Sequence, residues 1–423
     1  MAAIRLLMLA PMLLCAQLAQ AQTTYQVIDL VAQCPAGSTD VVAQAINNPG
    51  DVVGTAAVSD GQGGQVRQYF VWHNGSASII PSIGTVEGLN GGPGFGITDS
   101  GLVAGCSIDG NQWQCFIVNQ GAVTGLPDLT FMQFKPCGGS DAVVGTTTGQ
   151  IQYSDANNNP SSAPTTRVGL WFNGVITDLG PTDPNAFGVQ AAAASISDSG
   201  QYICGWGGTL WDDISIHPQA LLMTRDGNAT ALGGLSLPWG WATDVNNAGH
   251  AVGAAYVDQN TYHAALWRNG ATDLAPSGWQ WSMSLAINNT DQVVGYGWDA
   301  NGRSIPFLWN AGTLVDLNTL VDANGVAGPV TLDVAYDIND AGQIVASGIG
   351  PAGRQPYLLN PVAPPIPGDF NGDGIVNGRD FLIWQQHYPM LSGATRADGD
   401  ANGDGIVNGK DFLIWQQNYK PLK

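Results

Sequence analysis

The stretches LAINNTDQVVG (residues 285–295) and AQAINNPGDVVG (residues 43–54) are two copies of one phrase, and this phrase decides the fold. Five further copies, some degraded, bring the number to seven. Their last positions lie 40 to 59 residues apart, at Gly54, Gly105, Gly145, Cys204, Gly253, Gly295 and Ala346. Self-similarity with a period of this size is the signature of a repeat architecture.

A second phrase follows nearly every copy, as in AALWRNGATDL (residues 264–274) and PFLWNAGTLVDL (residues 306–317). Its alternating apolar residues and its Asn-Gly and Ala-Gly turns predict short antiparallel strands joined by hairpins. Each repeat then supplies about four strands, which is the size of a propeller blade. Because such a unit buries its faces only against neighbouring units, the sequence predicts a mainly β fold, a seven-bladed β-propeller.

The two ends of the repeat region complement each other. The last repeat runs through RQPYLLN (residues 354–360) and lacks its final strand, whereas residues 24–30, TYQVIDL, resemble that missing strand. Without closure the first and last blades would expose unpaired edges. We therefore expect the N-terminal strand to complete the seventh blade.

The phrases INxxGxVVG and LWxNG make this region similar to the extracellular HAF repeats, a family named for a His-Ala-Phe phrase that residues 263–265 approximate. The resemblance covers about residues 25–360, within a propeller domain expected at residues 22–360. It implies a secreted repeat protein and no particular reaction.

Charge and targeting signals limit the classes of partner. Thirteen Lys and Arg residues against 33 Asp and Glu residues give a net charge of -20, which disfavours nucleic acid and anionic membrane surfaces. Residues 1–21 have the apolar run and the small residues of a secretory signal peptide. No other segment has the apolar length of a membrane span. We expect an extracellular protein, or one held at the cell surface by a partner.

The C-terminal tail contains a second, shorter repeat. Residues 361–367, PVAPPIP, predict a stiff linker, and DFNGDGIVNGRDFLIWQQ (residues 369–386) is then repeated 31 positions later as DANGDGIVNGKDFLIWQQ (residues 400–417). Each copy opens with a loop that places oxygen donors at the spacing calcium requires, with Gly at position 6 for the turn. The sequence therefore predicts two Ca²⁺ ions, held by Asp369, Asn371, Asp373, Ile375 (carbonyl), Asn377 and Asp380, and by Asp400, Asn402, Asp404, Ile406 (carbonyl), Asn408 and Asp411. The alternative is a pair of Asp-Asn-Gly turns without metal.

Paired loops that end in aspartate and are each followed by one amphipathic helix resemble type I dockerin domains. This resemblance assigns residues 368–423 and implies two calcium-stabilised loop and helix units that bind a cohesin module. In that family the partner contacts loop positions 10 and 11, which here are Gly378, Arg379, Gly409 and Lys410, where the best-known members have a Ser-Thr pair. A simple attachment or stabilising tail is the alternative.

Five cysteines follow the predicted signal peptide. Cys106 and Cys115 flank CSIDGNQWQC, which is typical of a hairpin, so we expect a disulfide between them in an exported chain. The remaining cysteines are Cys34, Cys137 and Cys204, whose connectivity the sequence leaves open and of which at least one stays unpaired.

Tryptophans fall into two groups. Trp72, Trp171, Trp267 and Trp309 each lie three residues before a turn glycine, and this repetition predicts core positions. A different group could form a flat platform for sugar rings on neighbouring blades, namely Trp239, Trp241, Trp279 and Trp281. Packing between blades is the alternative for this second group.

Catalysis has little support in the sequence. Most glycosidases need two carboxylates of different proton affinity, yet Glu87 is the sole glutamate and no aspartate pair is marked. The sequence therefore favours a secreted, non-catalytic binding or display module that docks through calcium-dependent contacts to a cohesin-bearing, polysaccharide-related assembly. The alternative is a carbohydrate-active enzyme of such an assembly, a glycoside hydrolase or lyase that uses propeller aspartates.

Overall fold

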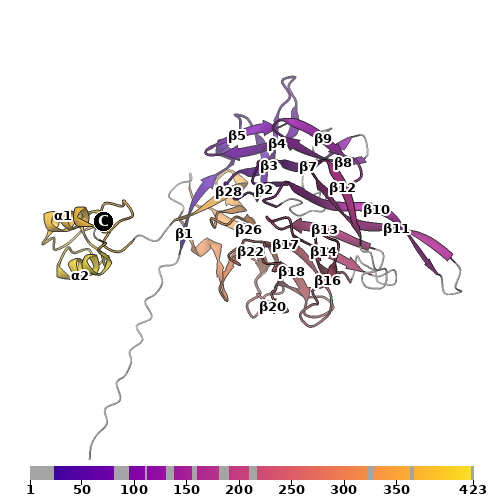
Figure 1. The fold of residues 1–423 in the computed structure, drawn as a ribbon. Coiled ribbons are helices and arrows are strands. Elements are labelled where there is room, and N and C mark those ends of the chain that lie inside the picture. Colours follow the sequence, from indigo (N-terminus) through magenta and orange to yellow (C-terminus); the bar gives the residue numbers. More distant parts are fainter. Residues whose placement is uncertain are drawn as a thin grey trace, which may run out of the picture. The chain divides into compact units, whose positions relative to one another are not determined.

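The computed structural model describes residues 23–80, 95–109, 112–129, 138–154, 160–180, 190–208, 217–322, 328–362 and 366–420 (Figure 1). The chain divides into two compact units. One is Tyr25–Pro361, and the other contains Val362–Lys423. Glu87, Cys137 and the predicted signal peptide lie outside the described residues.

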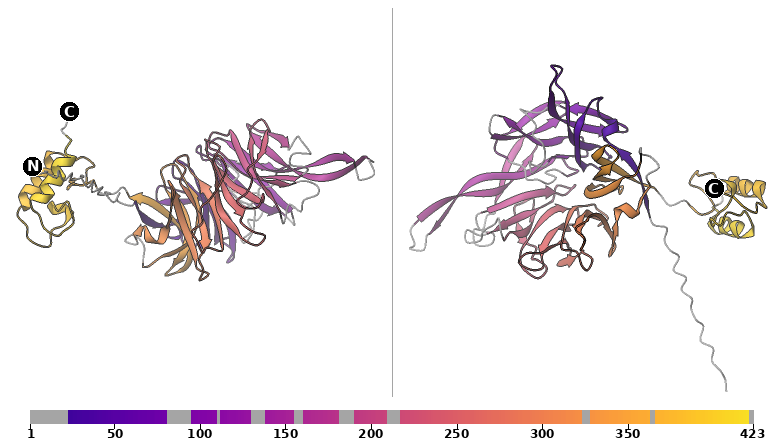
Figure 2. Two further views of the ribbon diagram at one scale, coloured as in Figure 1. Left: turned by 90° about the horizontal axis from the view of Figure 1, so that it is seen from below. Right: turned by 180° about the vertical axis from the view of Figure 1, so that it is seen from behind.

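The first unit is a ring of mainly antiparallel sheets, which confirms the predicted seven-bladed propeller (Figure 2). Four blades are separate four-stranded sheets whose strands pair in chain order. They are blade 1, with β2 (Thr39–Ile46), β3 (Val52–Ser59), β4 (Gln65–His73) and β5 (Ser76–Ile80); blade 2, with β6 (Gly96–Ile97), β7 (Val103–Asp109), β8 (Gln112–Asn119) and β9 (Ala122–Leu126); blade 5, with β17 (Gly240–Val245), β18 (Ala251–Tyr256), β19 (Tyr262–Trp267) and β20 (Ala271–Asp273); and blade 6, with β21 (Trp281–Ile287), β22 (Val293–Trp298), β23 (Ser304–Asn310) and β24 (Thr313–Asp316).

Blades 3 and 4 share one sheet, because β11 pairs in parallel with β13 at Thr166 and Gln190. Blade 3 contains the degraded copy of the phrase. Its strands β10 and β11 form a hairpin that extends well beyond the other blades (Figure 1). The strands are β10 (Ala142–Ser154), β11 (Pro160–Phe172) and β12 (Val175–Gly180) in blade 3, and β13 (Gln190–Ile196), β14 (Tyr202–Gly208), β15 (Gln219–Thr224) and β16 (Ala229–Ala231) in blade 4.

Blade 7 closes the ring as predicted. The N-terminal strand β1 (Thr24–Asp29) pairs with β28 (Gly353–Val362), which pairs with β27 (Ile344–Gly350) and then β26 (Thr331–Ile338). A fifth strand that the sequence did not predict, β25 (Val321–Asp322), adds to the outer side of β1 in parallel. The N-terminal strand is thus enclosed between two others.

The last glycine of the repeated phrase has a steric role. Opposite this glycine, the inner strand of the blade carries a β-bulge at Gln44, Ala194, Thr243, Leu285 or Tyr336. At Gly54, Gly253 and Gly295 a Cβ atom would come within 2.1 Å of an inner-strand carbonyl oxygen. In these three blades the bulge therefore leaves room only for glycine, whereas blade 7 has Ala346 opposite its bulge. Between blades, the repeated Trp72, Trp171, Trp267 and Trp309 are all buried, which confirms them as core residues.

The turn after each inner strand links its blade to the next. In each link a backbone N–H group donates to a side-chain oxygen of another blade, at 2.7 to 3.0 Å. The donor and acceptor pairs are Asp340 to Asn48, Asn48 to Asp99, Gly139 to Asp198, Ser199 to Asn247, Asn247 to Asn289, and Asn289 to Asp340. We call these residues the axial belt. All of them except Ser199 and Asn247 line, with further residues of all seven blades, a cavity of about 20 Å³, which has room for about one water molecule.

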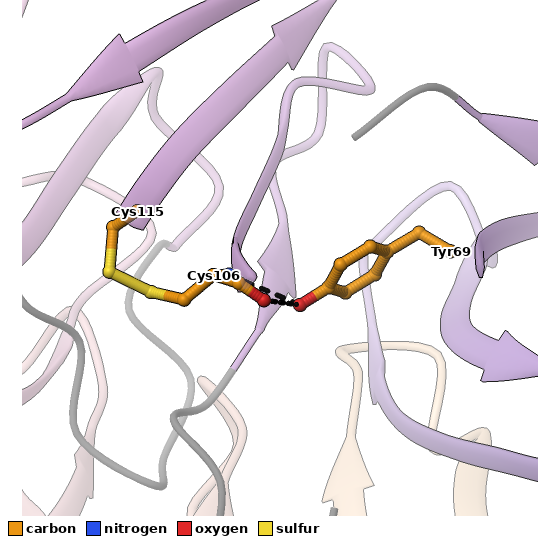
Figure 3. The surroundings of a disulfide bond; sticks show 3 residues. All are labelled: Tyr69, Cys106 and Cys115. Atoms are coloured by element: carbon orange, nitrogen blue, oxygen red, sulfur yellow. Dashed lines mark hydrogen bonds between the residues drawn. A yellow bond between two sulfur atoms is a disulfide. The ribbon is translucent and has the colours of Figure 1, made fainter. Parts of the chain in front are cut away.

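Cys106 and Cys115 are directly paired across β7 and β8 and are joined by a disulfide, with a Cα–Cα distance of 4.0 Å. The Tyr69 hydroxyl of blade 1 donates to the Cys106 carbonyl at 2.8 Å and accepts from its N–H at 3.1 Å (Figure 3). Cys34 and Cys204 have free thiols. Burial of the Cys34 thiol and, as a smaller cause, the charge of Asp29 raise the pKa of Cys34 to about 11.

The C-terminal unit contains two helices, α1 (Gly378–His387) and α2 (Gly409–Asn418), each preceded by one of the repeated loops. An isolated antiparallel bridge joins Met390, after α1, to Val407 in the second loop. Lys420 N–H donates to Val376 of the first loop at 2.9 Å. Each half of the unit is therefore tied to the other.

Candidate functional site

The first loop is organised by two buried aspartates. Asp369 accepts backbone N–H bonds from Gly372 at 2.9 Å and Gly374 at 3.0 Å. Asp380, at position 12, accepts from Phe370 at 2.8 Å, Asn371 at 3.1 Å and Asn377 at 2.8 Å. These bonds fold positions 1 to 12 into one compact turn. Asn377 also caps α1 by accepting from Arg379 N–H at 2.8 Å.

The second loop repeats this network 31 residues later. Asp400 accepts from Gly403 at 2.8 Å and Gly405 at 2.7 Å, and Asp411 accepts from Ala401, Asn402 and Asn408 at 2.8 to 3.3 Å. The remaining predicted donors lie at matching places, with Asn371, Asp373, Asn402 and Asp404 exposed, Ile375 exposed and Ile406 half-buried. The sequence repeat is therefore a repeat of geometry as well.

The chemistry of these loops fits a hard cation. Asp369, Asp380, Asp400 and Asp411 are at most 4% exposed, and none forms an ion pair with a basic side chain in the described part of the chain. Buried carboxylates without a counter-charge are costly, and a bound cation would supply that charge. Among the described residues, no three His, Cys, Asp or Glu side chains alone form a metal cluster. The predicted ligand sets also contain asparagine and main-chain oxygens, which calcium accepts.

The predicted partner-binding residues lie at the start of each helix. Gly378, Arg379, Gly409 and Lys410 are exposed. One turn further along, Leu382 is 61% exposed and Leu413 is 55% exposed. Each helix thus presents a basic residue next to an apolar one, and sequence reasoning did not single out the two leucines.

The two halves pack around their aromatic residues in a reciprocal way. The Trp384 indole N–H of α1 donates to the Asn408 carbonyl at 3.0 Å, and the Trp415 indole N–H of α2 donates to the Asn377 carbonyl at 3.0 Å. Phe381 and Phe412 meet between them, with ring centroids 6.1 Å apart. The unit therefore has approximate twofold symmetry, and its two exposed helix starts are near copies of one another.

In the propeller, all four candidate platform tryptophans are at least partly accessible. Trp281 is 41% exposed, and Trp239, Trp241 and Trp279 are half-buried. Trp279 is different, because its ring lies over Gly297, where a Cβ would come within 2.1 Å of it, and beside Phe307 in the core. This tryptophan packs blade 6.

The other three tryptophans belong to a larger group that sequence reasoning missed, here called the aromatic band. In blade 5, the ring centroids of Trp239 and Trp241 each lie 5.8 Å from that of Tyr256, and the centroid of Trp241 lies 5.1 Å from that of Tyr262. In blade 6, the ring centroid of Trp298 lies 6.4 Å from that of Trp281 and 5.2 Å from that of Tyr296. The Trp281 indole N–H of blade 6 donates to the Asn260 carbonyl of blade 5 at 3.0 Å. The band therefore crosses blades 5 and 6.

The band and the axial belt occupy opposite ends of the inner strands. Trp241 and Trp281 stand at the start of β17 and β21, whereas the belt residues follow the ends of these strands. At the belt, the Asp198 carboxylate accepts from the side-chain amides of Asn48 at 3.1 Å and Asn289 at 2.9 Å. The propeller aspartates that converge at the axis are therefore engaged in linking blades.

Comparison with known proteins addresses the two units separately. Residues 367–418 match the model of the Dockerin type I domain. No curated protein matches the chain. Several solved structures are similar at 13–14% identity: the β-propeller domain of the Trilobed protease from Pyrococcus furiosus (66% of this chain, 84% of that chain, TM-score 0.45), TolB from Acinetobacter baumannii (53%, 51%, 0.34) and puromycin hydrolase (78%, 52%, 0.45).

These likenesses concern the fold alone, and the chain spans about half the length of TolB and of puromycin hydrolase. In the described part of the chain, neither the length nor the hydropathy of any helix suffices to cross a membrane. Type I dockerin domains bind calcium and imply docking to a cohesin. The C-terminal unit of this propeller protein contains a dockerin type I domain at residues 367–418.

Proposed function

We propose that this chain is a secreted, non-catalytic binding or display protein whose propeller is carried into an extracellular, polysaccharide-related assembly by its C-terminal unit. The dockerin type I domain at residues 367–418 supports docking, since proteins with such domains typically belong to extracellular or cell-surface assemblies. Two calcium ions, one in each loop, would stabilise the docking unit by neutralising its buried carboxylates.

The docking contact would use either of two equivalent surfaces, one formed by Arg379 and Leu382 and the other by Lys410 and Leu413. The reciprocal tryptophan bonds described above relate the two surfaces by symmetry. A cohesin that fits one surface would therefore fit the other after a half-turn. The near identity of the halves supports docking in two orientations.

Charge reversal should distinguish two surfaces from one. With the full chain as bait, we expect a cohesin among the extracellular and envelope proteins of the source organism, retained with calcium and released by chelator. Arg379→Asp or Lys410→Asp alone should weaken binding of that purified cohesin only a few-fold. The double variant should weaken it more than tenfold, because both orientations then place a carboxylate in the contact.

Gln292→Ala changes a residue of the propeller and none of the docking unit, so this control variant should bind the cohesin as the wild type does. Full binding by the double variant would exclude the helix starts as the contact. If one single variant alone lost binding, the docking proposal would stand, but the cohesin would use one surface and one orientation. A chain that folds with calcium but retains no cohesin would contradict the docking proposal.

The aromatic band is the proposed contact with polysaccharide. Indole and phenol rings present flat apolar faces with a polar edge, which suits sugar rings. We expect the double variant Trp239→Ala with Trp281→Ala to lose retention on an insoluble polysaccharide panel by about tenfold or more, without turnover by either protein. Val175→Ala, an exposed apolar change on blade 3, should bind normally. Unchanged retention in the tryptophan variant would remove the band from the proposal.

The catalytic alternative has one observation in its favour, the convergence of Asp99, Asp198 and Asp340 at the belt. Their hydrogen bonds across blades account for them structurally. Hydrolysis or elimination of a polysaccharide by the full chain, abolished by Asp198→Asn in a protein that still unfolds at the same temperature, would overturn the non-catalytic proposal.

A further inference from the structure

A cavity of about 680 Å³ lies between blade 7 and blade 1, where the two ends of the repeat region meet. Its size falls within the roughly 300–1,000 Å³ of small-molecule sites. The bulge residues of the two inner strands, Gln44 and Tyr336, both line it. This cavity is separate from the small one enclosed by the axial belt.

Two arginines form opposite walls of the cavity. Arg67 pairs with Asp40 and donates to Thr55 Oγ1 at 3.1 Å. Arg354 pairs with Asp333 and donates to Ser347 Oγ at 3.0 Å, while this hydroxyl donates to Asp333 at 2.6 Å. The same group of one guanidinium, one hydroxyl and one carboxylate is thus present on each wall.

These two groups occupy equivalent places in their blades. Thr55 and Ser347 each follow the last position of the repeated phrase, and they pair with Tyr69 and Pro356. Arg67 and Arg354 each lie two residues before that partner. The other five blades have no arginine there, but Trp113, Thr166, Gln219, Tyr262 and Ser304.

Basic residues are scarce in this unit, which makes their position informative. Residues 25–361 contain six arginines and one lysine, and two of these seven line one cavity in adjacent blades. Only 10% of the Arg67 side chain is exposed, so its burial carries a desolvation cost. A charged residue that served only to keep the protein in solution would not need to be buried. The pair is therefore a feature of this cavity and not of the blade architecture.

The chemistry of the walls selects the ligand. Asp40 lines the cavity together with the two arginines, and Asp333 pairs with Arg354 from outside the lining. Each guanidinium is therefore paired with a carboxylate, while the lining offers guanidinium donors and carboxylate, amide and hydroxyl acceptors. A sugar hydroxyl both donates and accepts, and therefore suits such a lining. Tyr336 adds a ring face for stacking. An anionic ligand would face the Asp40 carboxylate in a chain of net charge -20.

We infer that the cavity between blades 7 and 1 binds a neutral saccharide, as a short oligosaccharide or the end of a longer chain. The inference names a site of its own, built from residues that neither the band nor the docking unit uses.

Calorimetric titration of the full chain with cellohexaose, xylohexaose and mannohexaose tests the inference, with trigalacturonic acid as the charged probe. At least one neutral probe should bind, and Arg354→Gln should weaken it at least tenfold. Ala352→Trp, which fills the cavity mouth without removing an ion pair, should do the same. Arg303→Gln is the matched control, since its side chain is also 58% exposed and paired with aspartates outside the cavity.

Absence of binding by every neutral probe at millimolar concentration would overturn the inference, as would equal binding by wild type and both cavity variants. Preference for trigalacturonic acid would overturn the assignment of a neutral ligand. The variant Trp239→Ala with Trp281→Ala separates the two sites. If it loses the short probes while Arg354→Gln keeps them, the sugar lies on the band, and the cavity inference fails while the proposed function stands.

Discussion

Deletion of residues 24–30 is expected to abolish the cooperative unfolding transition of the propeller. Tyr25, Val27 and Leu30 are each at most 1% exposed, and burial of such side chains stabilises a fold by about 1.5–3 kcal/mol apiece. Their summed loss is comparable to the roughly 5–15 kcal/mol that stabilises a whole domain. Scanning calorimetry of the full chain should show the propeller transition missing, with aggregation through the exposed edge of β28.

Single substitutions on β1 separate burial from mere strand length. Val27→Asp places an unpaired carboxylate in the core between β28 and β25 and should lower the unfolding temperature sharply. Gln26→Asp changes the exposed neighbour on the same strand and should have little effect. Equal behaviour of the two variants, or a normal transition after the deletion, would show that the ring is stable without its N-terminal strand.

Asp380→Ala is expected to unfold the C-terminal unit even with calcium present. Three backbone N–H groups would lose their acceptor, at about 1–3 kcal/mol for each one left buried without a partner. A core of this size rarely supplies more than about 3–5 kcal/mol. Hydrogen exchange of the full chain should show loss of amide protection in α1 and α2, while the propeller strands keep theirs.

Asp411→Ala should behave in the same way, because its contacts repeat those of Asp380. Chelation of calcium should reduce protection of both helices in the wild-type chain, since four buried carboxylates would then lack a counter-charge. Gln385→Ala, on the exposed face of α1, is the control and should leave protection unchanged. Protection that is insensitive to both chelator and Asp380→Ala would contradict metal stabilisation of the unit.

The blade number, the closing strand and the repeated core tryptophans could be predicted because each depends on a local phrase that recurs. The bulge that makes the phrase end in glycine was not predictable, since it involves the backbone of a strand about ten residues earlier. β25 was missed because two residues pair with β1 only after the ring has closed. Blade 3 was recognisable as a blade, but its degraded phrase gave no sign of the long β10–β11 hairpin.

The candidate sites differ for the same reason. The calcium loops are contiguous, so their donors could be named residue by residue. The aromatic band brings together Trp239 and Trp298 from different blades, and the cavity brings together Arg67 and Arg354 from the first and last blades. No sequence spacing indicates these neighbours. Trp279 had the same local context as Trp281, yet the neighbouring Gly297 makes room for it in the core.

The enclosure of β28 between β27 and β1 has a mechanical consequence. The chain leaves the ring from the end of β28, so tension on the C-terminal unit enters the ring along that strand. A pull along a strand that is hydrogen-bonded on both sides loads its two ladders in shear, and many bonds must break together. An assembly that pulls this protein by its tail would thus load a strand of blade 7 that is held on both sides, and the N-terminal strand would share the load.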